Sequence, residues 1–301
     1  MKKVVAFLSV LVISAFTGEG RADNWVVSEI ASPPSSLFVE RCRRGDSQLP
    51  DGCTTRANGD VSAAWYEEPT DRYAHAILGD AIEAGTLAVR TSQGSTARLR
   101  LPSTEVFEDR FPRIVDLDRD GTSEIVTIRS SSSGGGSVAV YGVRGGALRE
   151  IASTRFIGRA NRWLNIAGID DFIGDGSLQI AFVETPHIGG TLKLAQYRGN
   201  SLRVVAQAGG FSNHQIRSPV MDLSAVADFN GDGRLDLAVP DASRTALRVV
   251  TFTAGGVRDL ATIPLPGAVV QPFELRDELG GKVLYLGLSS GQVVSVRHQA
   301  N

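Results

Sequence analysis

Residues 228–239 read DFNGDGRLDLAV, and two other stretches of the chain follow the same pattern. These are DLDRDGTSEIV at 116–126 and DFIGDGSLQIA at 171–181. The leading aspartates, Asp116, Asp171 and Asp228, are separated by 55 and then 57 residues. A pattern that recurs at a fixed period of this length predicts a fold built from copies of one supersecondary unit.

Each copy continues with the same order of short apolar segments and glycine-rich turns. After the first acidic stretch come residues 125–128, 138–143 and 147–152, with Gly145-Gly146 between the last two segments. The corresponding segments lie at 192–197 and 202–206 in the second copy, and at 247–252 and 257–263 in the third. Alternating apolar residues between glycine turns favour strands over helices. Four short strands per period are typical of a propeller blade.

Two flanking regions look like weaker copies of the unit. Segments 74–79, 86–91 and 97–101 form the first, and segments 273–276, 282–288 and 292–298 form the last. The last copy lacks one strand, which residues 25–30 are expected to supply, so closing the ring. We therefore predict an all-β propeller of about five four-stranded blades, formed by a single domain at 23–301. The expected repeat units lie at roughly 73–112, 113–163, 164–222, 223–269 and 270–301.

Two features of the sequence bear on the location of the protein, namely the N-terminal segment and the cysteines. Residues 1–22 combine two lysines, a short apolar run at 4–16 and the small-residue ending Gly20-Arg21-Ala22, which is typical of a secretory signal peptide. The apolar run is shorter than the roughly 20 residues of a membrane-spanning helix, although an uncleaved anchor is the alternative. Cys42 and Cys53 are expected to form a disulfide in an exported chain. We expect a periplasmic or secreted monomer without a membrane span after signal cleavage.

The acidic stretches place oxygen-bearing side chains at every second position, with a glycine that lets the backbone turn back. Hard oxygen ligands at this density suit Ca²⁺. The expected ligands are Asp116, Asp118, Asp120, the carbonyl of Thr122, and Glu124 in the first loop, and Asp228, Asn230, Asp232, the carbonyl of Arg234, and Asp236 in the third. An EF-hand is excluded because its twelfth position would be Thr127 or Val239. The alternative to a calcium site is an acidic turn without an ion.

The second loop departs from this pattern. Ile173 stands where the middle oxygen ligand should be, and Gln179 replaces the last acid. Asp171 and Asp175 remain, and they make a poor site. We expect weak or no calcium there, and so about two structural calcium ions in the protein.

The stretch at 228–239 resembles the FG-GAP/VCBS repeat family, which is related to the propeller of integrin α-subunits. The resemblance covers three units clearly. It implies a propeller with calcium in the loop between the first two strands of a blade, where the ion is structural. For function it implies only a range of roles, which includes adhesion, carbohydrate binding, protein interaction and accessory parts of enzymes.

Loops on the face opposite the acidic loops carry a second group of notable side chains. They are Arg159, Asn161, Arg162, Trp163, His187, Asn213, His214 and Arg217. Arginine and asparagine can bind carboxylates or sugar hydroxyls, and a tryptophan can stack on a ring. This pattern favours a polar or anionic ligand or a protein partner at that face, with solvated loop residues as the alternative.

Composition and motifs limit the remaining function classes. A formal net charge of −2 gives no basic field for nucleic acid. The GxSxG pattern at 287–291 precedes a predicted strand, whereas a hydrolase nucleophile elbow needs a helix there. The sequence favours a non-enzymatic, calcium-stabilised binding module. The alternative is a periplasmic lyase or hydrolase that uses histidines and arginines at one end of the propeller channel.

Overall fold

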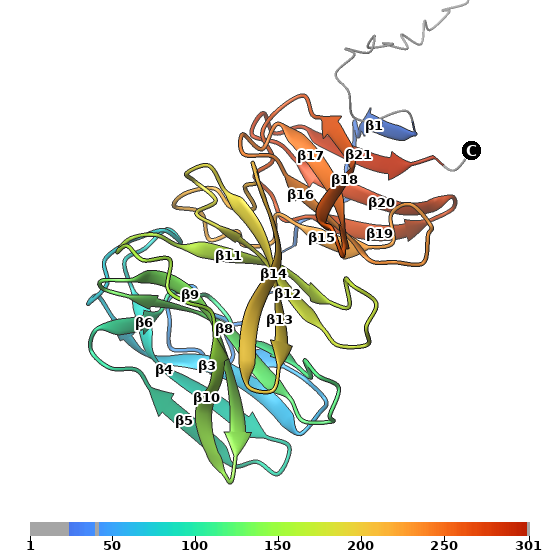
Figure 1. The fold of residues 1–301 in the computed structure, drawn as a ribbon. Helices are drawn as coiled ribbons and strands as arrows, with labels where there is room; N and C mark the ends of the chain where they lie inside the picture. The colour runs from blue at the N-terminus through green and yellow to red at the C-terminus, as the bar shows by residue number, and fades with distance from the viewer. Residues whose placement is uncertain (1–23, 40–41, 300–301) are drawn as a thin grey trace, which may run out of the picture.

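The computed structural model describes residues 24–39 and 42–299, and every element of regular secondary structure within these ranges is a β-strand. They form one nine-stranded and three four-stranded antiparallel sheets, which follow one another in sequence order across the molecule (Figure 1). The predicted signal peptide at 1–22 lies outside the described residues. In the part of the chain that the structure covers, no helix is long and apolar enough to cross a membrane.

Two of the four-stranded sheets are simple meanders, in which each strand pairs with the next. One contains β11 (Leu164–Asp170), β12 (Gln179–Glu184), β13 (Thr191–Arg198) and β14 (Ser201–Gly209). The other contains β15 (Ala225–Ala227), β16 (Asp236–Pro240), β17 (Ala246–Thr253) and β18 (Gly256–Pro264). Their strands coincide with those predicted for the second and third acidic repeats.

The nine-stranded sheet consists of two such meanders joined by one short strand. The first meander has β2 (Thr55–Arg56), β3 (Val61–Thr70), β4 (Glu83–Thr91) and β5 (Thr96–Arg100), and the second has β7 (Arg113–Val115), β8 (Glu124–Ser131), β9 (Gly135–Arg144) and β10 (Ala147–Ser153). The joining strand, β6 (Glu105–Phe107), pairs with both β4 and β8. The chain thus forms five four-stranded units, as the propeller prediction required. These units are numbered in chain order as the first to fifth sheets, and β6 joins the first to the second.

The N-terminal strand completes the last sheet. β19 (Glu274–Glu278), β20 (Gly281–Gly287) and β21 (Val293–His298) form three strands, and β1 (Trp25–Glu29) pairs with β21. Trp25 lies opposite His298 and Glu29 opposite Val294, so the two ends of the described chain lie side by side (Figure 1). The prediction that residues 25–30 supply the missing strand is confirmed.

The strand predicted at 74–79 is wrong, and so is the start of the first unit near residue 73. These residues lie in the loop between β3 and β4, and the first sheet begins at β2. Ala76 has a φ of 54°, which interrupts an extended chain. Ile77 and Leu78 are buried because they pack into a hydrophobic cluster beneath the loop, which explains the apolar signal in the sequence.

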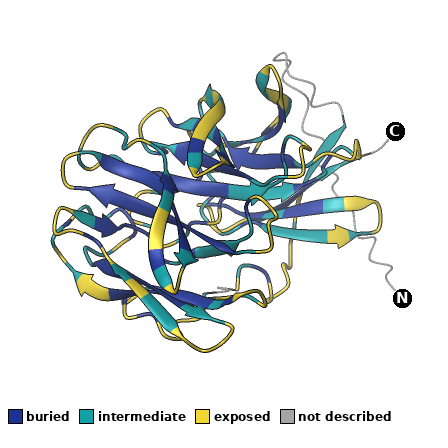
Figure 2. Ribbon diagram, turned by 60° about the horizontal axis from the view of Figure 1, so that its bottom comes forward, coloured by how far each residue is buried: buried dark blue, intermediate teal, exposed yellow. Residues whose placement is uncertain are grey.

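The hydrophobic core is divided into layers between consecutive sheets. Four large clusters lie between the first and second, second and third, third and fourth, and fourth and fifth sheets. Strands such as β8 and β16 are buried along their whole length because both faces of their sheets are covered. Figure 2 shows buried residues along the middle of the strands and exposed residues in the turns. Face-to-face stacking of successive sheets is the packing of propeller blades.

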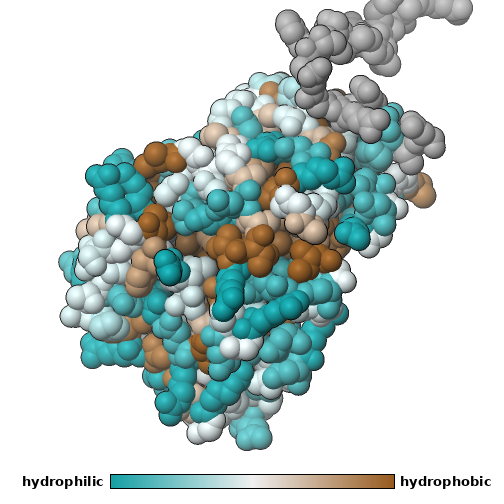
Figure 3. All heavy atoms as spheres, in the orientation of Figure 1, coloured by the Kyte–Doolittle hydropathy of each residue, from teal (hydrophilic) through white to brown (hydrophobic). Residues whose placement is uncertain are grey.

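The outer strands of three blades share a β-bulge, which supports a common repeat. The extra residues are Ile151 in β10, Val205 in β14 and Leu260 in β18. Before the bulge, β10 and β18 carry Glu150 and Asp259, whereas β14 carries the exposed Val204. In the space-filling view, hydrophobic surface gathers near the centre, where Figure 1 labels β14 (Figure 3).

The segment between β1 and β2 runs from the last sheet back to the first. Ser36 Oγ accepts a hydrogen bond from Arg276 of β19 at 3.2 Å, and the Cys53 amide donates to the carbonyl of Arg110 at 2.9 Å. The predicted disulfide between Cys42 and Cys53 is present in this segment. A disulfide is compatible with an exported protein.

Candidate metal centres and binding face

The three acidic loops share one hydrogen-bonding scheme. Each joins the first two strands of a blade, and its first aspartate accepts hydrogen bonds from two backbone amides four and five residues later. For Asp116 these distances are 3.0 and 2.9 Å, for Asp171 3.1 and 3.0 Å, and for Asp228 3.2 and 2.9 Å. The glycine at the sixth position has a φ between 83° and 88° in all three loops, a conformation that favours glycine. These hydrogen bonds and the glycine therefore fix the backbone conformation of each loop.

In the first loop, the predicted side chains converge. Oxygen atoms of Asp116, Asp118 and Asp120 lie within 4.8 Å of one another on the exposed side of the turn. Three carboxylates this close repel one another unless a cation lies between them. Glu124, predicted as a ligand, instead accepts from the Leu117 amide and pairs with Arg144, both at 3.0 Å. The donor set fits a calcium ion, with Glu124 held against the protein.

In the third loop, the informative residue is Asp236. One of its oxygens accepts from the Phe229 amide at 3.2 Å, while the other is buried and makes no well-formed hydrogen bond within the described residues. Burial raises the pKa of Asp236 to about 6. Buried carboxylate oxygens are normally paired, so this oxygen, with the Thr251 hydroxyl near it, is a candidate donor to a cation. Asp228 and Asp232 raise the pKa of Asp236 further through their negative charge, but among the described residues only the first loop brings three carboxylates within 4.8 Å of one another. The types of donor in the third loop still fit calcium.

In the second loop, protein donors occupy the place of an ion. Asp175 accepts from the Ser177 amide and hydroxyl, from Gln179 at 3.2 Å and from Gln196 at 2.7 Å, and Arg198 pairs with it at 2.5 Å. The Ser177 hydroxyl and the Arg198 guanidinium hold the pKa of Asp175 near 2. The carboxylate of Asp175 is thus already neutralised by protein donors.

On the opposite face, the structure brings together part of the predicted ligand set, but mostly below the surface. Trp163 stacks on His187 at 6.2 Å and contacts His214 edge-on at 4.7 Å. Trp163 is 2% exposed and donates from its indole nitrogen to the carbonyl of Glu108, and Asn213 and His214 are fully buried. These three side chains therefore support the face and do not contact a ligand there. The expectation that Trp163 stacks on a ligand ring is wrong.

Four residues of the predicted set lie at the surface. Arg159, Asn161 and Arg217 are exposed and Arg162 is half-buried. Their loops are tied to those of neighbouring blades, since the Asn161 amide donates to the Tyr73 hydroxyl at 3.0 Å and the Arg217 amide to the Ile77 carbonyl at 2.8 Å. The face is thus assembled from loops of several blades.

The buried histidine pair has defined proton positions. His214 Nε2 lies 2.8 Å from the carbonyl of Ser218, which can only accept, so this nitrogen carries the proton. His214 Nδ1 then accepts from His187 Nε2 at 2.9 Å. Burial lowers the pKa of His187 to about 4 and that of His214 to about 3. Both rings are neutral at pH 7.

Acid is expected to weaken the fold through this pair. The unfolded chain protonates both histidines below about pH 6.5, whereas the folded chain does so only near pH 4 and below, so stability is lost as the pH falls through this window. His214→Gln keeps a donor for Ser218 but removes one titrating ring. Between pH 7 and 4, wild type should lose on the order of 2 kcal/mol more unfolding free energy than this variant.

Denaturant unfolding followed by tryptophan fluorescence across this pH range measures the difference. Glu83 and Glu108, whose pKa values burial raises, act in the opposite direction, so only the comparison of variant with wild type isolates the histidine pair. Parallel stability curves for the two proteins would contradict the assignment of a neutral, protonation-resistant His214.

Sequence reasoning missed a histidine and an acid beside this cluster. His75 Nδ1 lies 2.6 Å from Glu108 Oε1, and the other oxygen of Glu108 accepts from the Ser130 hydroxyl. Burial raises the pKa of Glu108. A histidine oriented by a buried carboxylate can act as a general base, which is the chemistry that the enzymatic alternative requires. No motif marks this pair because its members are 33 residues apart.

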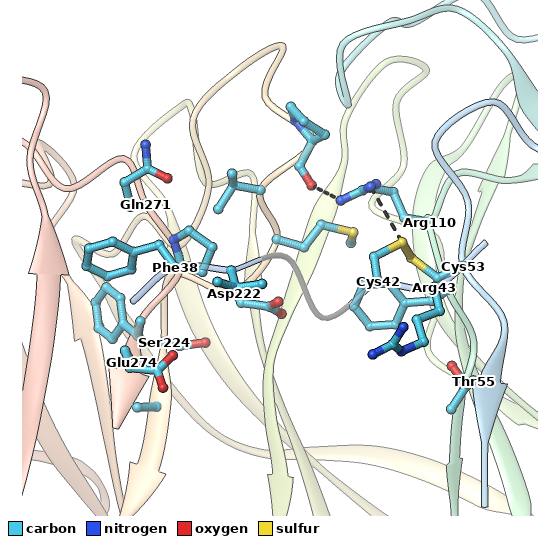
Figure 4. Close-up of a pocket in the computed structure, with 18 of the residues that line it drawn as sticks. Phe38, Cys42, Arg43, Cys53, Thr55, Arg110, Asp222, Ser224, Gln271 and Glu274 are labelled. Carbon is cyan, nitrogen blue, oxygen red and sulfur yellow. Dashed lines mark hydrogen bonds between the residues drawn. A yellow bond between two sulfur atoms is a disulfide. The ribbon is translucent and has the colours of Figure 1, made fainter. Parts of the chain in front are cut away.

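A cavity of about 850 Å³ lies between the first, fourth and fifth sheets near the same face. Phe38 and Gln271 stand on one side, and Arg43, Arg110 and the Cys42–Cys53 disulfide stand on the other (Figure 4). Arg110 fixes this wall, because its guanidinium donates to the carbonyls of Asp51 and Pro219. The walls come from five separate segments, so no local pattern could reveal the cavity. Its size suits a small ligand or a side chain of a partner.

Comparison with known proteins shows no family and gives similarities to solved structures. No family model matches the sequence. No curated protein sequence matches it. The chain is similar to the crystal structure of the exotype rhamnogalacturonan lyase YesX, with a TM-score of 0.41 and a sequence identity of 13%. The match covers 88% of this chain and 57% of that chain. Sqt1 of Saccharomyces cerevisiae is 13% identical, with 82% and 61% covered and a TM-score of 0.48. This chain spans less than two thirds of either protein.

Proposed function

We propose that the protein is an exported, non-enzymatic binding module of the FG-GAP/VCBS type, stabilised by about two calcium ions. The observation that carries this proposal is the difference between the three loops. They share one backbone scheme, yet the first and third keep oxygens without protein cations between them, and the second has its carboxylate neutralised by Arg198. An acidic turn without an ion would give no reason for this difference.

Calcium in this proposal has a structural role. The first and third loops join β7 to β8 and β15 to β16, at one end of their blades. An ion there would fix the innermost strand of each blade to the next one, and its binding free energy would add to the stability of the fold. In the first loop the ligands would be Asp116, Asp118, Asp120 and the carbonyl of Thr122. In the third loop they would be Asp228, Asn230, Asp232, the carbonyl of Arg234, and Asp236.

The binding function is assigned to the opposite face. That face carries the cavity of about 850 Å³ and the inter-blade loops that present Arg159, Arg162 and Arg217. Loops held on a rigid β scaffold are the usual place for binding residues. The Cys42–Cys53 disulfide next to the cavity fits a periplasmic or secreted location, where we expect a monomer that binds a protein or a polar ligand.

Isothermal titration of the chelator-treated protein with calcium tests the proposal. The expected stoichiometry is about two ions per chain, and magnesium should bind more weakly because it requires closer octahedral geometry. Absence of calcium binding would remove the metal half of the proposal. Binding of three equivalent ions would show that the second loop also holds calcium.

A further inference from the structure

Four loops of the face that carries the predicted ligand residues contain more arginines than acids, whereas the adjoining loop at 71–82 contains Asp71, Asp80 and one arginine. Residues 154–163, 185–190, 211–219 and 241–245 contain five arginines and one acid, Asp241. That acid is used within its own turn, where it accepts hydrogen bonds from the Thr245 and Ala246 amides and the Ser243 hydroxyl. Within the described ranges, Arg159, Arg162 and Arg217 form no ion pair with an acid. Their positive charge is therefore presented to solvent.

Two large apolar side chains stand among these arginines. Ile188 is 59% exposed and Ile216 is 57% exposed. Ile188 follows His187 directly and Ile216 follows His214 by two residues, and the two histidine rings lie 5.1 Å apart, so the isoleucines belong to adjoining loops. We use the name arginine collar for Arg159, Arg162 and Arg217 together with Ile188 and Ile216. Exposed apolar groups rimmed by charge are characteristic of protein interaction sites.

The collar is held in place by buried contacts and by an unusual backbone. Arg244 donates to the carbonyl of His214 at 3.3 Å and to that of Val269 at 3.2 Å, which ties two of the loops together. Asn161, Thr185 and Arg217 have φ values between 52° and 63°. This conformation is costly, above all for the β-branched Thr185, and it persists only where the surroundings enforce it. A surface fixed in this way loses little conformational entropy when a partner binds.

We infer that the arginine collar docks an acidic protein segment that also carries apolar side chains, an inference that rests on the proposed binding role of this face. The arginines supply charge complementarity to aspartates and glutamates, and the two isoleucines supply apolar contacts. A sugar polymer is commonly bound by stacking on an exposed aromatic side chain, and a nucleic acid by a row of side chains that contact its phosphates. Trp163, the one tryptophan in these loops, is buried, and the isoleucines have no counterpart in such ligands.

The test uses the purified protein and a synthetic peptide in which glutamates flank leucines, with binding followed by fluorescence anisotropy. The double variant Arg162→Glu/Arg217→Glu should weaken peptide binding at least tenfold at low salt, and added salt should shrink the difference. Ile188→Ser should weaken binding to a similar extent at low and high salt. Arg258→Glu on the outer strand β18 makes the same charge change as either collar substitution alone, so it is the control for net charge, and it should leave binding unchanged.

One further probe, polygalacturonate, separates the sources of negative charge. Polygalacturonate that binds as tightly as the peptide, with the same dependence on the arginines, would overturn the protein segment in favour of a simple polyanion site. No binding of any probe, or an equal loss with Arg258→Glu, would overturn the collar itself. The collar variants should still bind calcium with the wild-type stoichiometry. If docking fails while calcium still binds, only the collar proposal fails and the proposed metal role stands. If the wild-type protein binds the peptide but no calcium, only the metal role fails.

Discussion

Calcium is expected to raise the melting temperature of the protein by roughly 10 °C or more. At a free calcium concentration a thousandfold above Kd, each bound ion stabilises the folded chain by about 4 kcal/mol. A chain of about 150–250 residues gains about 2–4 °C for each kcal/mol, and two ions act on this one. The physical reason is the convergence of Asp116, Asp118 and Asp120, whose mutual repulsion destabilises the ion-free loop. Thermal melts in excess calcium and in excess EDTA measure the shift.

Two matched variants assign this effect to particular loops. Asp228→Asn removes a charged ligand from the third loop and should abolish about half of the calcium-dependent shift. Asp171→Asn makes the same change at the same position of the second loop, where Arg198 already neutralises Asp175, and it should leave the shift intact. An equal loss in both variants would show that the second loop also holds an ion. A shift of the same size in magnesium would argue against calcium-specific sites.

Much of the fold could be predicted because local patterns and the repeat agree. Residues 138–143 and 147–152 alternate around Gly145-Gly146, and the structure places β9, a turn and β10 there. The N-terminal strand was inferred from a missing partner in the last unit, and β1 fills that place. In both cases the information lies in neighbouring residues or in a count of strands per unit.

The first blade shows where this reasoning fails. β3 is one of the longest strands, yet no acidic loop marks its start, and the buried Tyr73, Ile77 and Leu78 gave a strand-like signal in the wrong place. Their burial depends on packing against the neighbouring sheets, which is a tertiary effect. Strand preference is sensitive to such context, so a single sequence does not distinguish a buried loop from a strand.

The candidate binding face was predicted in part for the same reason. Chain topology correctly grouped the loops of Trp163, His187 and His214, since loops at one end of successive blades meet. It did not reveal which side chains reach the surface. Trp163 and His214 are buried, where their rings pack edge-on and donate to the carbonyls of Glu108 and Ser218. Ile188 and Ile216 are exposed. Side-chain burial within a loop is decided by packing between blades, and sequence spacing does not encode it.

The acidic and basic loops give the molecule two unlike faces despite its net charge of −2. The loops at 116–120 and 228–232 gather carboxylates at one end of the blades, while the arginine collar lies at the other. Calcium would neutralise much of the acidic face without altering the collar. An acidic partner is then attracted to one end of the molecule only, which is a source of orientation as well as affinity.

Disruption of β1 should have the other large effect on stability. Val27 packs with Trp25 into the cluster between the fourth and fifth sheets and lies opposite the buried Val296. Val27 is partly buried, so Val27→Asp would place a carboxylate without a partner against apolar side chains, at a cost on the order of 2 kcal/mol in unfolding free energy. Detachment of the strand would also expose the edge of β21 and promote aggregation. Urea unfolding and light scattering of the variant measure the two effects.

Val26→Asp is the matched control, because successive side chains of a strand point to opposite faces and Val26 is not part of that cluster. It should cost less than about 1 kcal/mol and leave the protein monodisperse. If both variants were equally mild, β1 would be a loosely attached strand, and the last blade would be stable with three strands. If Val27→Asp alone unfolds the protein, the N-terminal strand is an integral part of the last blade, and the five-unit array depends on the pairing of its two ends.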